Sequence, residues 1–378
     1  MPRDANGKHL SLMQLCILVK PRSGSNCMKS TFALVVITLS IFVNSGVALA
    51  FETDQYNLPP VPLADIGDEV SEYVEDNLRK AVAKVNADIE MSVSCLESRT
   101  KGCGSAYEQR KKLVHLRSNE AVAHAFFELT GEGNVFTTKF GNWMRVHKFR
   151  GTPDRYKTSY EESIFILNPT DYLTISPTVR LFGAEFGIDK LEHFFQQGYK
   201  YYTIGRESSA EGKSPNEAAR RAIKWGQRTE RTYYGLLVSG VYSNADLYAN
   251  YAGMHFYDGL TKPLQINDKS RPAPLTLKDG SWSIETRDLR ETLLKPFLTD
   301  HMNEALNPSA FRFTLVRSVR RAVKKHGCPD WRRAYPEMTE IAMANRSNAL
   351  EMWNGEDYGF TKKDRIVTIA DTCFDRKD

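Results

Sequence analysis

Apolar residues recur every three or four positions after residue 65, which is the period of an amphipathic helix. They are Val70, Val74, Leu78, Val82, Val85 and Ile89, and they predict a helix from about residue 65 to residue 89. A second helical pattern runs from about residue 107 to residue 129, with a break predicted at Ser118 and an end at Thr130-Gly131.

The segment from about 135 to 187 lacks this period. It contains Pro153, Pro169 and Pro177, together with short β-rich runs such as residues 163–167. We therefore expect an irregular segment with one or two short strands. Further along, residues 275–284 alternate around Asp279-Gly280, which predicts a β-hairpin.

Helical patterns return from about 287 to 306 and from about 311 to 326, and Gly327 and Pro329 are expected to end the last helix. The fold class predicted is therefore mainly α. The last helix is basic, with Arg312, Arg317, Arg320, Arg321, Lys324 and Lys325 along it. Such a helix can lie on an anionic membrane surface, but an ordinary surface helix with a solvated basic face is the favoured interpretation.

Residues 28–50 have the order of a cleavable signal peptide. A positive start at Met28-Lys29 is followed by an apolar run from Phe32 to Val43 and by small residues that end at Ala50. The apolar run is shorter than the ~20 residues that a membrane span needs, which disfavours an uncleaved anchor. We predict export, cleavage near Ala50, and a soluble periplasmic or secreted protein.

The mature protein is expected to occupy residues 51–378 as one large, mostly helical domain. Residues 1–27 precede Met28, and we interpret them as a misassigned upstream start. Residues 1–50 hold five basic residues and one acidic residue, so their removal lowers the formal net charge from +5 to +1. Nucleic-acid binding needs a concentrated cationic surface, and we therefore expect no nucleic-acid partner.

Four cysteines remain after cleavage, which are Cys95, Cys103, Cys328 and Cys373. An even number in an oxidising compartment favours two disulfides, for which three connectivities exist. Cys95 with Cys103 is the economical pairing because a short polar turn separates them, and Cys328 would then pair with Cys373. A zinc site is disfavoured because C-x-x-C spacing is lacking.

Three helical segments between residues 188 and 257 carry the unusual polar residues. In the first, Asp189, His193 and Gln197 share one face because they lie four residues apart. A solvent-facing stripe is the simpler interpretation of this helix taken alone. Lys190 is rotated towards the apolar side, which favours it as a partner for a buried acid.

The second segment begins at Ser214-Pro215-Asn216-Glu217, which has the form of a capping box. An apolar stripe follows, made of Ala219, Ile223, Gly226, Tyr233, Tyr234, Leu237 and Val241, and Glu230 lies near its middle. A carboxylate that points into a core requires a partner. Lys190 is the favoured ion-pair partner of Glu230, and His193 is the other candidate.

The third segment starts at Ser243, whose spacing to Asp246 resembles an N-cap. Asp246, Asn250 and Gly253 share a face, and Gly253 permits close approach by a neighbouring helix. Simple capping is an equally good interpretation of Asp246. His255 lies on the other side and is interpreted as a core or surface histidine.

The run Asp189-Lys190-x-x-His193-Phe194, then Glu230, then Ser243-x-x-Asp246-x-x-x-Asn250-x-x-Gly253, resembles the pattern of VanZ-like envelope proteins and of related small bacterial lipoproteins of unknown function. The likeness covers about 65 residues, under a fifth of the chain. It implies that the six polar residues from Asp189 to Asn250 converge. VanZ-like proteins are membrane-embedded, which this mature chain is not expected to be, and the resemblance implies no particular reaction.

Two functions follow from this cluster. The first is an exported bacterial cell-envelope protein, a component of the envelope or of its membrane surface, in which Lys190, Asp246 and Asn250 belong to a polar core that is structural or binds a small ligand. The second is a hydrolase of an envelope lipid or glycan, with His193 as base, Asp189 orienting it and Glu230 as acid. A metal-dependent form would use Asp189, His193, Glu230 and Asp246 as ligands. The sequence identifies no cofactor.

Overall fold

A computed structural model of the protein describes residues 52–98, 102–133, 137–285 and 289–375. The chain divides into two compact units, Met1–Val47 and Ala48–Asp378, and the described residues all belong to the second unit. The predicted signal peptide and the upstream segment lie outside the described residues, and what was inferred for them stays a prediction.

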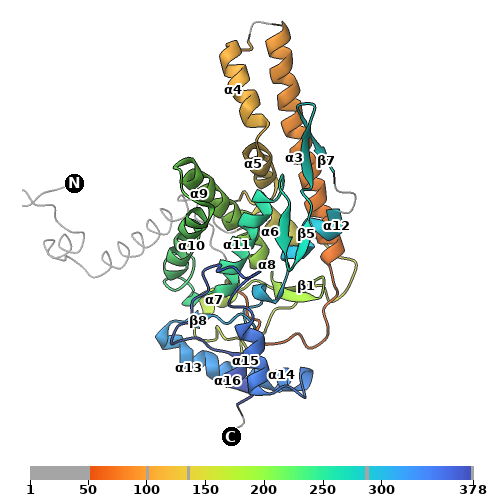
Figure 1. Ribbon diagram of the computed structural model, residues 1–378. Helices are drawn as coiled ribbons and strands as arrows, with labels where there is room; N and C mark the ends of the chain where they lie inside the picture. The colour runs from red at the N-terminus through yellow and green to blue at the C-terminus, as the bar shows by residue number, and fades with distance from the viewer. Residues whose placement is uncertain (1–51, 99–101, 134–136, 286–288, 376–378) are drawn as a thin grey trace, which may run out of the picture. The chain divides into compact units, whose positions relative to one another are not determined.

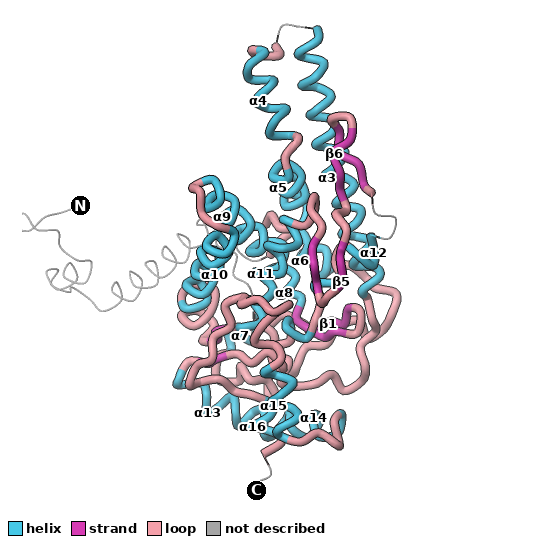
Figure 2. The backbone as a smooth tube through the Cα atoms, viewed as in Figure 1, coloured by secondary structure: helices cyan, strands magenta, loops and turns pink. Residues whose placement is uncertain are grey.

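The second unit is mainly α with short antiparallel strand pairs, as the sequence predicts (Figures 1 and 2). Its α-helices are α3 (Gly67–Ser98), α4 (Ala106–Leu116), α5 (Asn119–Thr130), α6 (Lys139–Val146), α7 (Pro169–Thr174), α8 (Ile188–Glu192), α9 (Gly198–Ala210), α10 (Pro215–Arg231), α11 (Asn244–Asp258), α12 (Leu289–Thr292), α13 (Phe313–Ala322), α14 (Cys328–Ala334), α15 (Glu340–Asn348) and α16 (Ile369–Cys373). Wider π-helical turns form η1 (His193–Gln197) and η4 (Val323–Gly327), and 3-10 turns form η2 (Lys295–Phe297) and η3 (Asp300–Met302). The strands pair as β1 (Thr178–Leu181) with β2 (Ala184–Gly187), β3 (Val241–Tyr242) with β8 (Ala310–Phe311), β4 (Leu264–Ile266) with β5 (Lys269–Arg271), and β6 (Leu275–Lys278) with β7 (Ser281–Ile284).

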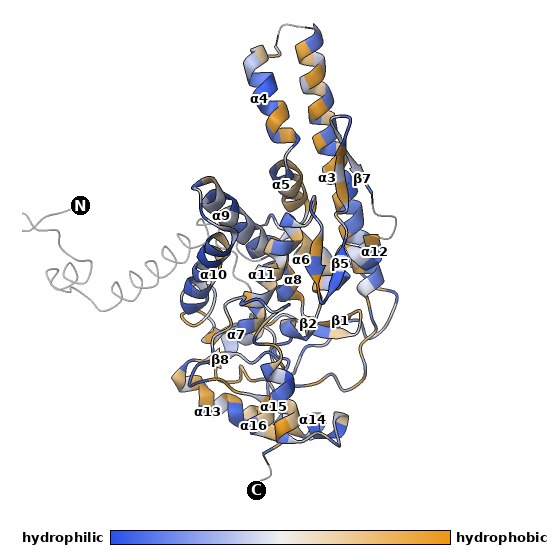
Figure 3. Cartoon of the chain, in the orientation of Figure 1, coloured by the Kyte–Doolittle hydropathy of each residue, from blue (hydrophilic) through white to orange (hydrophobic). Residues whose placement is uncertain are grey.

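Helix α3 extends past the predicted end at Ile89 as far as Ser98. Its predicted apolar stripe is buried and packs against α4 and α5, and Figure 3 shows apolar residues recurring along the helix. The disulfide between Cys95 and Cys103 ties its last turns to the start of α4. Closing this short ring contributes roughly 2–3 kcal/mol by chain entropy.

The predicted break at Ser118 separates α4 from α5. Ser118 has extended backbone angles and is the N-cap residue of α5. Helix α4 begins with a capping box, in which Ser105 Oγ accepts a hydrogen bond from Glu108 N at 3.2 Å. The Ser105 cap satisfies a backbone group that a helix start leaves without an intrahelical partner, whereas Ser118 makes no such side-chain bond.

The segment from 135 to 187 has more regular structure than its sequence predicts, because it includes α6 and α7. The strand expected at residues 163–167 is wrong: these residues form turns, and the strands are β1 and β2. Local bonds explain the difference, since Ser163 N donates to Ser159 O at 3.0 Å and Ile166 N donates to Ser163 O at 3.2 Å. These donors are therefore committed to turns instead of a ladder.

The hairpin predicted at residues 275–284 is confirmed. Strands β6 and β7 pair in the register Leu275 with Ile284 and Lys278 with Ser281. Asp279 and Gly280 have φ angles of 48° and 83°. Two left-handed residues in succession are typical of the type I′ turn, whose twist matches that of the strands.

The helix predicted from 287 to 306 is wrong. Arg287 lies outside the described residues, and from Leu289 onward the chain forms one short helix, α12, followed by the separate turns η2 and η3. Pro296 explains the interruption, because proline lacks the N–H group that an α-helix interior requires. Glu304 consequently lies in a loop, where it is free of any helical face.

The last predicted helix begins later and ends later than expected. Phe311 pairs with Val241 in a strand, α13 begins at Phe313, and the helical run continues through η4 and α14 to Ala334. Gly327 does not end this helical run. Its role is in packing, since a Cβ at this position would lie 2.3 Å from Tyr56 O. Glycine is required here for close packing. Pro329 lies in the first turn of α14, directly after the π-helical turn η4.

Of the basic residues predicted along this helix, Arg317, Arg320, Arg321, Lys324 and Lys325 are exposed. Val319, Ala322 and Val323 face the core. The second disulfide, Cys328–Cys373, joins α14 to α16. Both predicted pairings are therefore present.

Two apolar cores make up the interior of the unit. The larger includes Leu191 and Leu247, and the smaller includes Val241 and Ala305. These residues are sequence neighbours of the buried acids and of Lys190. The polar side chains between residues 188 and 257 therefore lie where the two cores meet.

The helical run from α8 through η1 to α9 packs against α10 and α11. Its closest approach is at two glycines: a Cβ on Gly198 would lie 2.6 Å from Gly253 Cα, and a Cβ on Gly253 would lie 2.1 Å from Phe194 O. The role predicted for Gly253, close approach to a neighbouring helix, is confirmed.

We expect Gly253→Ala to destabilise the protein by about 1–3 kcal/mol, because the new methyl group collides with backbone. Gly205→Ala in α9 is the matched control: its Cβ would meet nothing within 4 Å, and alanine favours a helix by about 0.5–1 kcal/mol. Urea denaturation of both variants measures the difference. Equal effects of the two substitutions would contradict the close packing.

Candidate functional site

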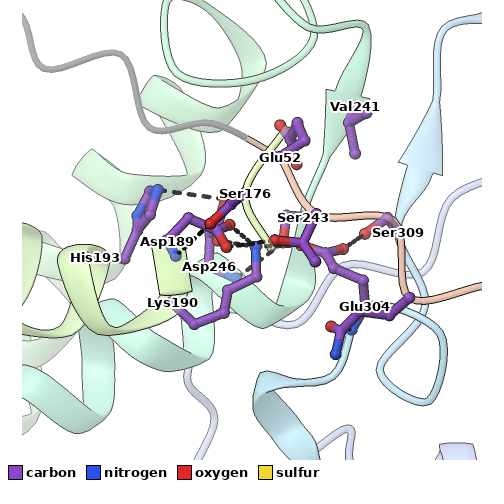
Figure 4. Close-up of polar contacts among 12 residues, drawn as sticks. Glu52, Ser176, Asp189, Lys190, His193, Val241, Ser243, Asp246, Glu304 and Ser309 are labelled. Atoms are coloured by element: carbon purple, nitrogen blue, oxygen red, sulfur yellow. Dashed lines mark hydrogen bonds and ion pairs between the residues drawn. The ribbon is translucent and has the colours of Figure 1, made fainter. Parts of the chain in front are cut away.

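The centre of the candidate site is the ammonium group of Lys190, which is buried among carboxylates (Figure 4). Its Nζ lies 2.7 Å from Asp189 Oδ2 and 2.5 Å from Asp246 Oδ1, and it also pairs with Glu304. The partners come from α8, α11 and the loop after η3. One side chain therefore connects three parts of the chain.

We call seven buried side chains the polar cluster: Glu52, Asp189, Lys190, His193, Glu230, Asp246 and Glu304. Each has an exposed fraction of 6% or less. A charged group removed from water in this way is stable only when paired or hydrogen-bonded. The contacts of each member therefore decide what the cluster can do.

Asp189 is held by the segment that starts at Glu52. Thr53 Oγ1 donates to Asp189 Oδ1 at 2.5 Å, and Asp189 N donates to Ser176 Oγ at 3.1 Å. Helix α8 starts directly after strand β2, which places Asp189 at its first turn. Burial raises the pKa of Asp189, and Lys190 opposes that rise.

Glu304 reaches the cluster from its loop through several contacts. Its backbone N donates to Gln55 Oε1 at 2.8 Å, Ser243 Oγ donates to its Oε1 at 2.6 Å, and Ser309 Oγ donates to its Oε2. Burial raises the pKa of Glu304 as well, against the effect of Lys190. Burial also opposes the charge on Lys190, but its carboxylate partners outweigh burial and raise its pKa well above the ordinary value.

His193 lies on η1 and faces α11. Its Nδ1 is 3.0 Å from Asn250 Oδ1, and its Nε2 is 3.4 Å from Asp246 Oδ2. The second contact is within ion-pair range, yet Nε2 has no hydrogen-bond partner among the described residues. The ring of His193 therefore lies beside Asp246.

Glu230 is buried at the end of α10, as its place in the apolar pattern predicts. Its Oε2 accepts a hydrogen bond from Ser243 N at 3.3 Å, and its Oε1 has no partner in the part of the chain that is described. Burial and the neighbouring Asp246 raise its pKa well above the ordinary value. A protonated carboxyl group lowers the cost of burial.

The predicted pairing of Lys190 with Glu230 is wrong. The ammonium pairs with Asp189, Asp246 and Glu304 instead. Helix α10 ends at Arg231, so the apolar stripe does not continue along a helix to Val241. Tyr233 and Leu237 lie in turns and are exposed.

The solvent-facing interpretation of the first helix is also wrong, because Asp189, His193 and Gln197 are all buried. The capping interpretation of Asp246 is half right. Ser243 Oγ accepts from Asp246 N at 2.9 Å, as in an N-cap. The carboxylate of Asp246 binds Lys190 instead, and Glu230 accepts the bond from Ser243 N that a capping box would assign to Asp246.

Two members of the cluster, Glu52 and Glu304, are absent from the sequence interpretation. Glu52 Oε1 accepts from Ser239 Oγ at 2.8 Å, whereas its Oε2 has no hydrogen-bond partner within the described ranges. Burial, followed by Asp246 and Glu304, raises its pKa well above the ordinary value. Both acids lie far along the chain from residues 188–257, and no local pattern marks either of them.

The structure brings together Asp189, Lys190, His193, Glu230, Asp246 and Asn250, but Asp189 does not bond to His193 as the hydrolase hypothesis requires. Asp189 contacts Lys190 and Thr53, and the residue that bonds to the ring of His193 is Asn250. His255 lies elsewhere, 3.4 Å from Glu356.

No family model, curated protein or solved structure matches this chain. The resemblance to VanZ-like envelope proteins therefore stays a prediction. Over the described ranges, the helices are each too short or too polar to cross a membrane.

Asp54 holds the segment that starts at Glu52 beside the cluster. Its carboxylate accepts from Asn57 Nδ2 at 2.9 Å, from Ile164 N at 3.1 Å and from Tyr56 N at 3.2 Å. Burial raises its pKa from 3.8 to about 6 despite these bonds. The folded state therefore holds this proton at pH values where the unfolded chain has lost it.

Because the folded-state pKa is the higher one, stability from Asp54 is greatest below pH 4 and is lost as the pH rises through about 6. We expect Asp54→Asn to gain on the wild type by up to about 3 kcal/mol between pH 4 and pH 7. Urea denaturation across this range measures the gain, and the comparison cancels the titration of the other carboxyl groups. Parallel curves for the two proteins would contradict the raised pKa.

Proposed function

We propose that this chain is an exported protein of the bacterial cell envelope, and that its polar cluster is a structural core that holds the segment from Glu52 to Asn57 against the helices. The observation that carries this proposal is the buried Lys190 ammonium, which bonds to three carboxylates from three parts of the chain. A pairing of this kind fixes one register of the elements involved.

Two observations support export. Glu52, Thr53 and Asp54 are buried, so the folded core begins directly after the predicted cleavage position at Ala50. The disulfides Cys95–Cys103 and Cys328–Cys373 suit an oxidising compartment. A core that starts after the predicted cleavage position and two disulfides are both compatible with a protein of the cell envelope.

The cluster's burial supports a structural role over hydrolysis. A general base must reach the proton that it removes, whereas His193 is 1% exposed and Glu230 is fully buried. The orienting partner required for the hydrolase hypothesis, Asp189, is bonded to Lys190. We therefore place hydrolysis of an envelope lipid or glycan second.

Lys190→Met tests the structural role. Removing the ammonium leaves carboxylates buried without their partner, and we expect a loss of about 3–5 kcal/mol in unfolding free energy. Lys262→Met is the matched control, because Lys262 forms an exposed pair with Asp258 at 2.9 Å, and such pairs contribute about 0.5 kcal/mol or less. Denaturation of both variants decides. A Lys190→Met protein as stable as the control would refute the proposal.

N-terminal sequencing of the protein recovered from cells that express residues 1–378 tests export. We expect the envelope fraction to contain a chain that begins at Phe51. Replacing Ala48 and Ala50 with lysine should block processing, because the cleavage site requires small residues there. An envelope protein that retains residues 28–50, or a cellular peptide from residues 8–20, would contradict the predicted leader or start.

A further inference from the structure

We propose that His193, Glu230 and Asp246 bind one divalent transition-metal ion. The proposal adds a ligand to the cluster described above, and it rests on the same site as the structural role. The ligand atoms of these residues all lie within 4.8 Å of one another. The residues come from η1, α10 and α11, and all three are buried.

Each of the three side chains is anchored through one atom and has a second possible ligand atom. His193 is anchored through Nδ1 by Asn250 at 3.0 Å, Asp246 through Oδ1 by Lys190 at 2.5 Å, and Glu230 through Oε2 by Ser243 N at 3.3 Å. Metal ligands in proteins are oriented by outer hydrogen bonds of this kind. Nε2, Oδ2 and Oε1 are then left for an ion.

The tautomer of His193 leaves a lone pair directed at acids. Asn250 Oδ1 can only accept, so Nδ1 carries the proton and Nε2 is the acceptor nitrogen in this orientation of the amide. Nε2 lies 3.4 Å from Asp246 Oδ2. Among the described residues, neither Nε2 nor Glu230 Oε1 has a hydrogen-bond partner. The lone pairs of Nε2 and Asp246 Oδ2 face each other, and a cation between these two atoms removes their repulsion in a low-dielectric interior.

The spacing of the ligand atoms suits a small ion. Two ligands about 2.1 Å from a tetrahedral zinc ion lie about 3.4 Å from each other. His193 Nε2 and Asp246 Oδ2 are separated by 3.4 Å. A ligand atom of Glu230 lies within 4.8 Å of the other two ligand atoms.

A second group of ligand atoms, from Glu52, Asp246 and Glu304, also lies within 4.8 Å. The ammonium of Lys190 already binds Asp246 and Glu304 there. A metal ion in that group would meet a positive charge at close range. The group that contains His193 is therefore the metal site, and Lys190 is the cation of the other group.

A buried water molecule is the alternative occupant, since it could donate to both Nε2 and Oε1. Water brings no charge, however. A divalent cation would also offset the charge of the Asp246 carboxylate, which lies 3.4 Å from Nε2, and this favours a metal ion over water.

The donor atoms decide the class of ion. One imidazole nitrogen with two carboxylate oxygens suits zinc, manganese or iron(II), whereas calcium and magnesium take oxygen ligands. The ion would join η1, α10 and α11 in addition to the connections that Lys190 makes. Its binding should therefore stabilise the folded chain.

Titration of the chelator-treated mature protein with zinc, manganese and cobalt(II) chloride, followed by calorimetry, tests the site. We expect one ion per chain and a higher melting temperature on binding. His193→Gln and Glu230→Gln should each weaken binding by at least about tenfold. Glu356→Gln is the matched control: it removes an acid that lies 3.4 Å from His255, outside the polar cluster, and it should keep the stoichiometry and the affinity.

Circular dichroism checks that each variant is folded. If His193→Gln does not fold, the binding result for Glu230→Gln decides. A folded wild type that binds none of the three ions would overturn the proposal, as would unchanged binding by the His193 and Glu230 variants. If Glu304→Gln loses binding while His193→Gln and Glu230→Gln keep it, the ion lies in the other group and the proposal is overturned. These results are separate from Lys190→Met, which tests only the structural role.

Discussion

The constraint on which the rest of this structure depends is one ammonium group without access to water. Lys190 can be buried only because Asp189, Asp246 and Glu304 surround it, and those acids can be charged there only because of Lys190. The elements that carry them must therefore assemble together. The two apolar cores supply most of the burial, but they do not by themselves select one arrangement, since apolar contacts are non-directional.

Features written in short stretches of sequence could be predicted. The stripe of α3, the break at Ser118 and the turn at Asp279-Gly280 each follow from residues that are neighbours along the chain. Local periodicity and capping chemistry contain this information. Periodicity also placed Glu230 in the core, whereas the convergence of His193, Glu230 and Asp246 was expected only from the resemblance to VanZ-like proteins.

What could not be predicted depends on partners distant in sequence. Glu304 seemed to belong to a helix until Pro296 broke it, and Glu52 seemed only to follow a leader. The pairing of Lys190 could not be read from the α8 sequence, because two of its acids lie 56 and 114 residues away. Gly327 is a residue type that often ends helices, but here it allows Tyr56 O to approach the helix closely.

The segment from Glu52 to Asn57 lies between partners drawn from the far end of the chain. Tyr56 donates to Val367 O at 2.9 Å, across 311 residues, and Trp331 Nε1 donates to Tyr56 O at 3.0 Å. The residues around Tyr56 are synthesised early, and they cannot form these hydrogen bonds until the residues near the C-terminus have been synthesised. Completion of this core belongs to the whole chain after synthesis, and contacts of such long sequence separation make folding slow.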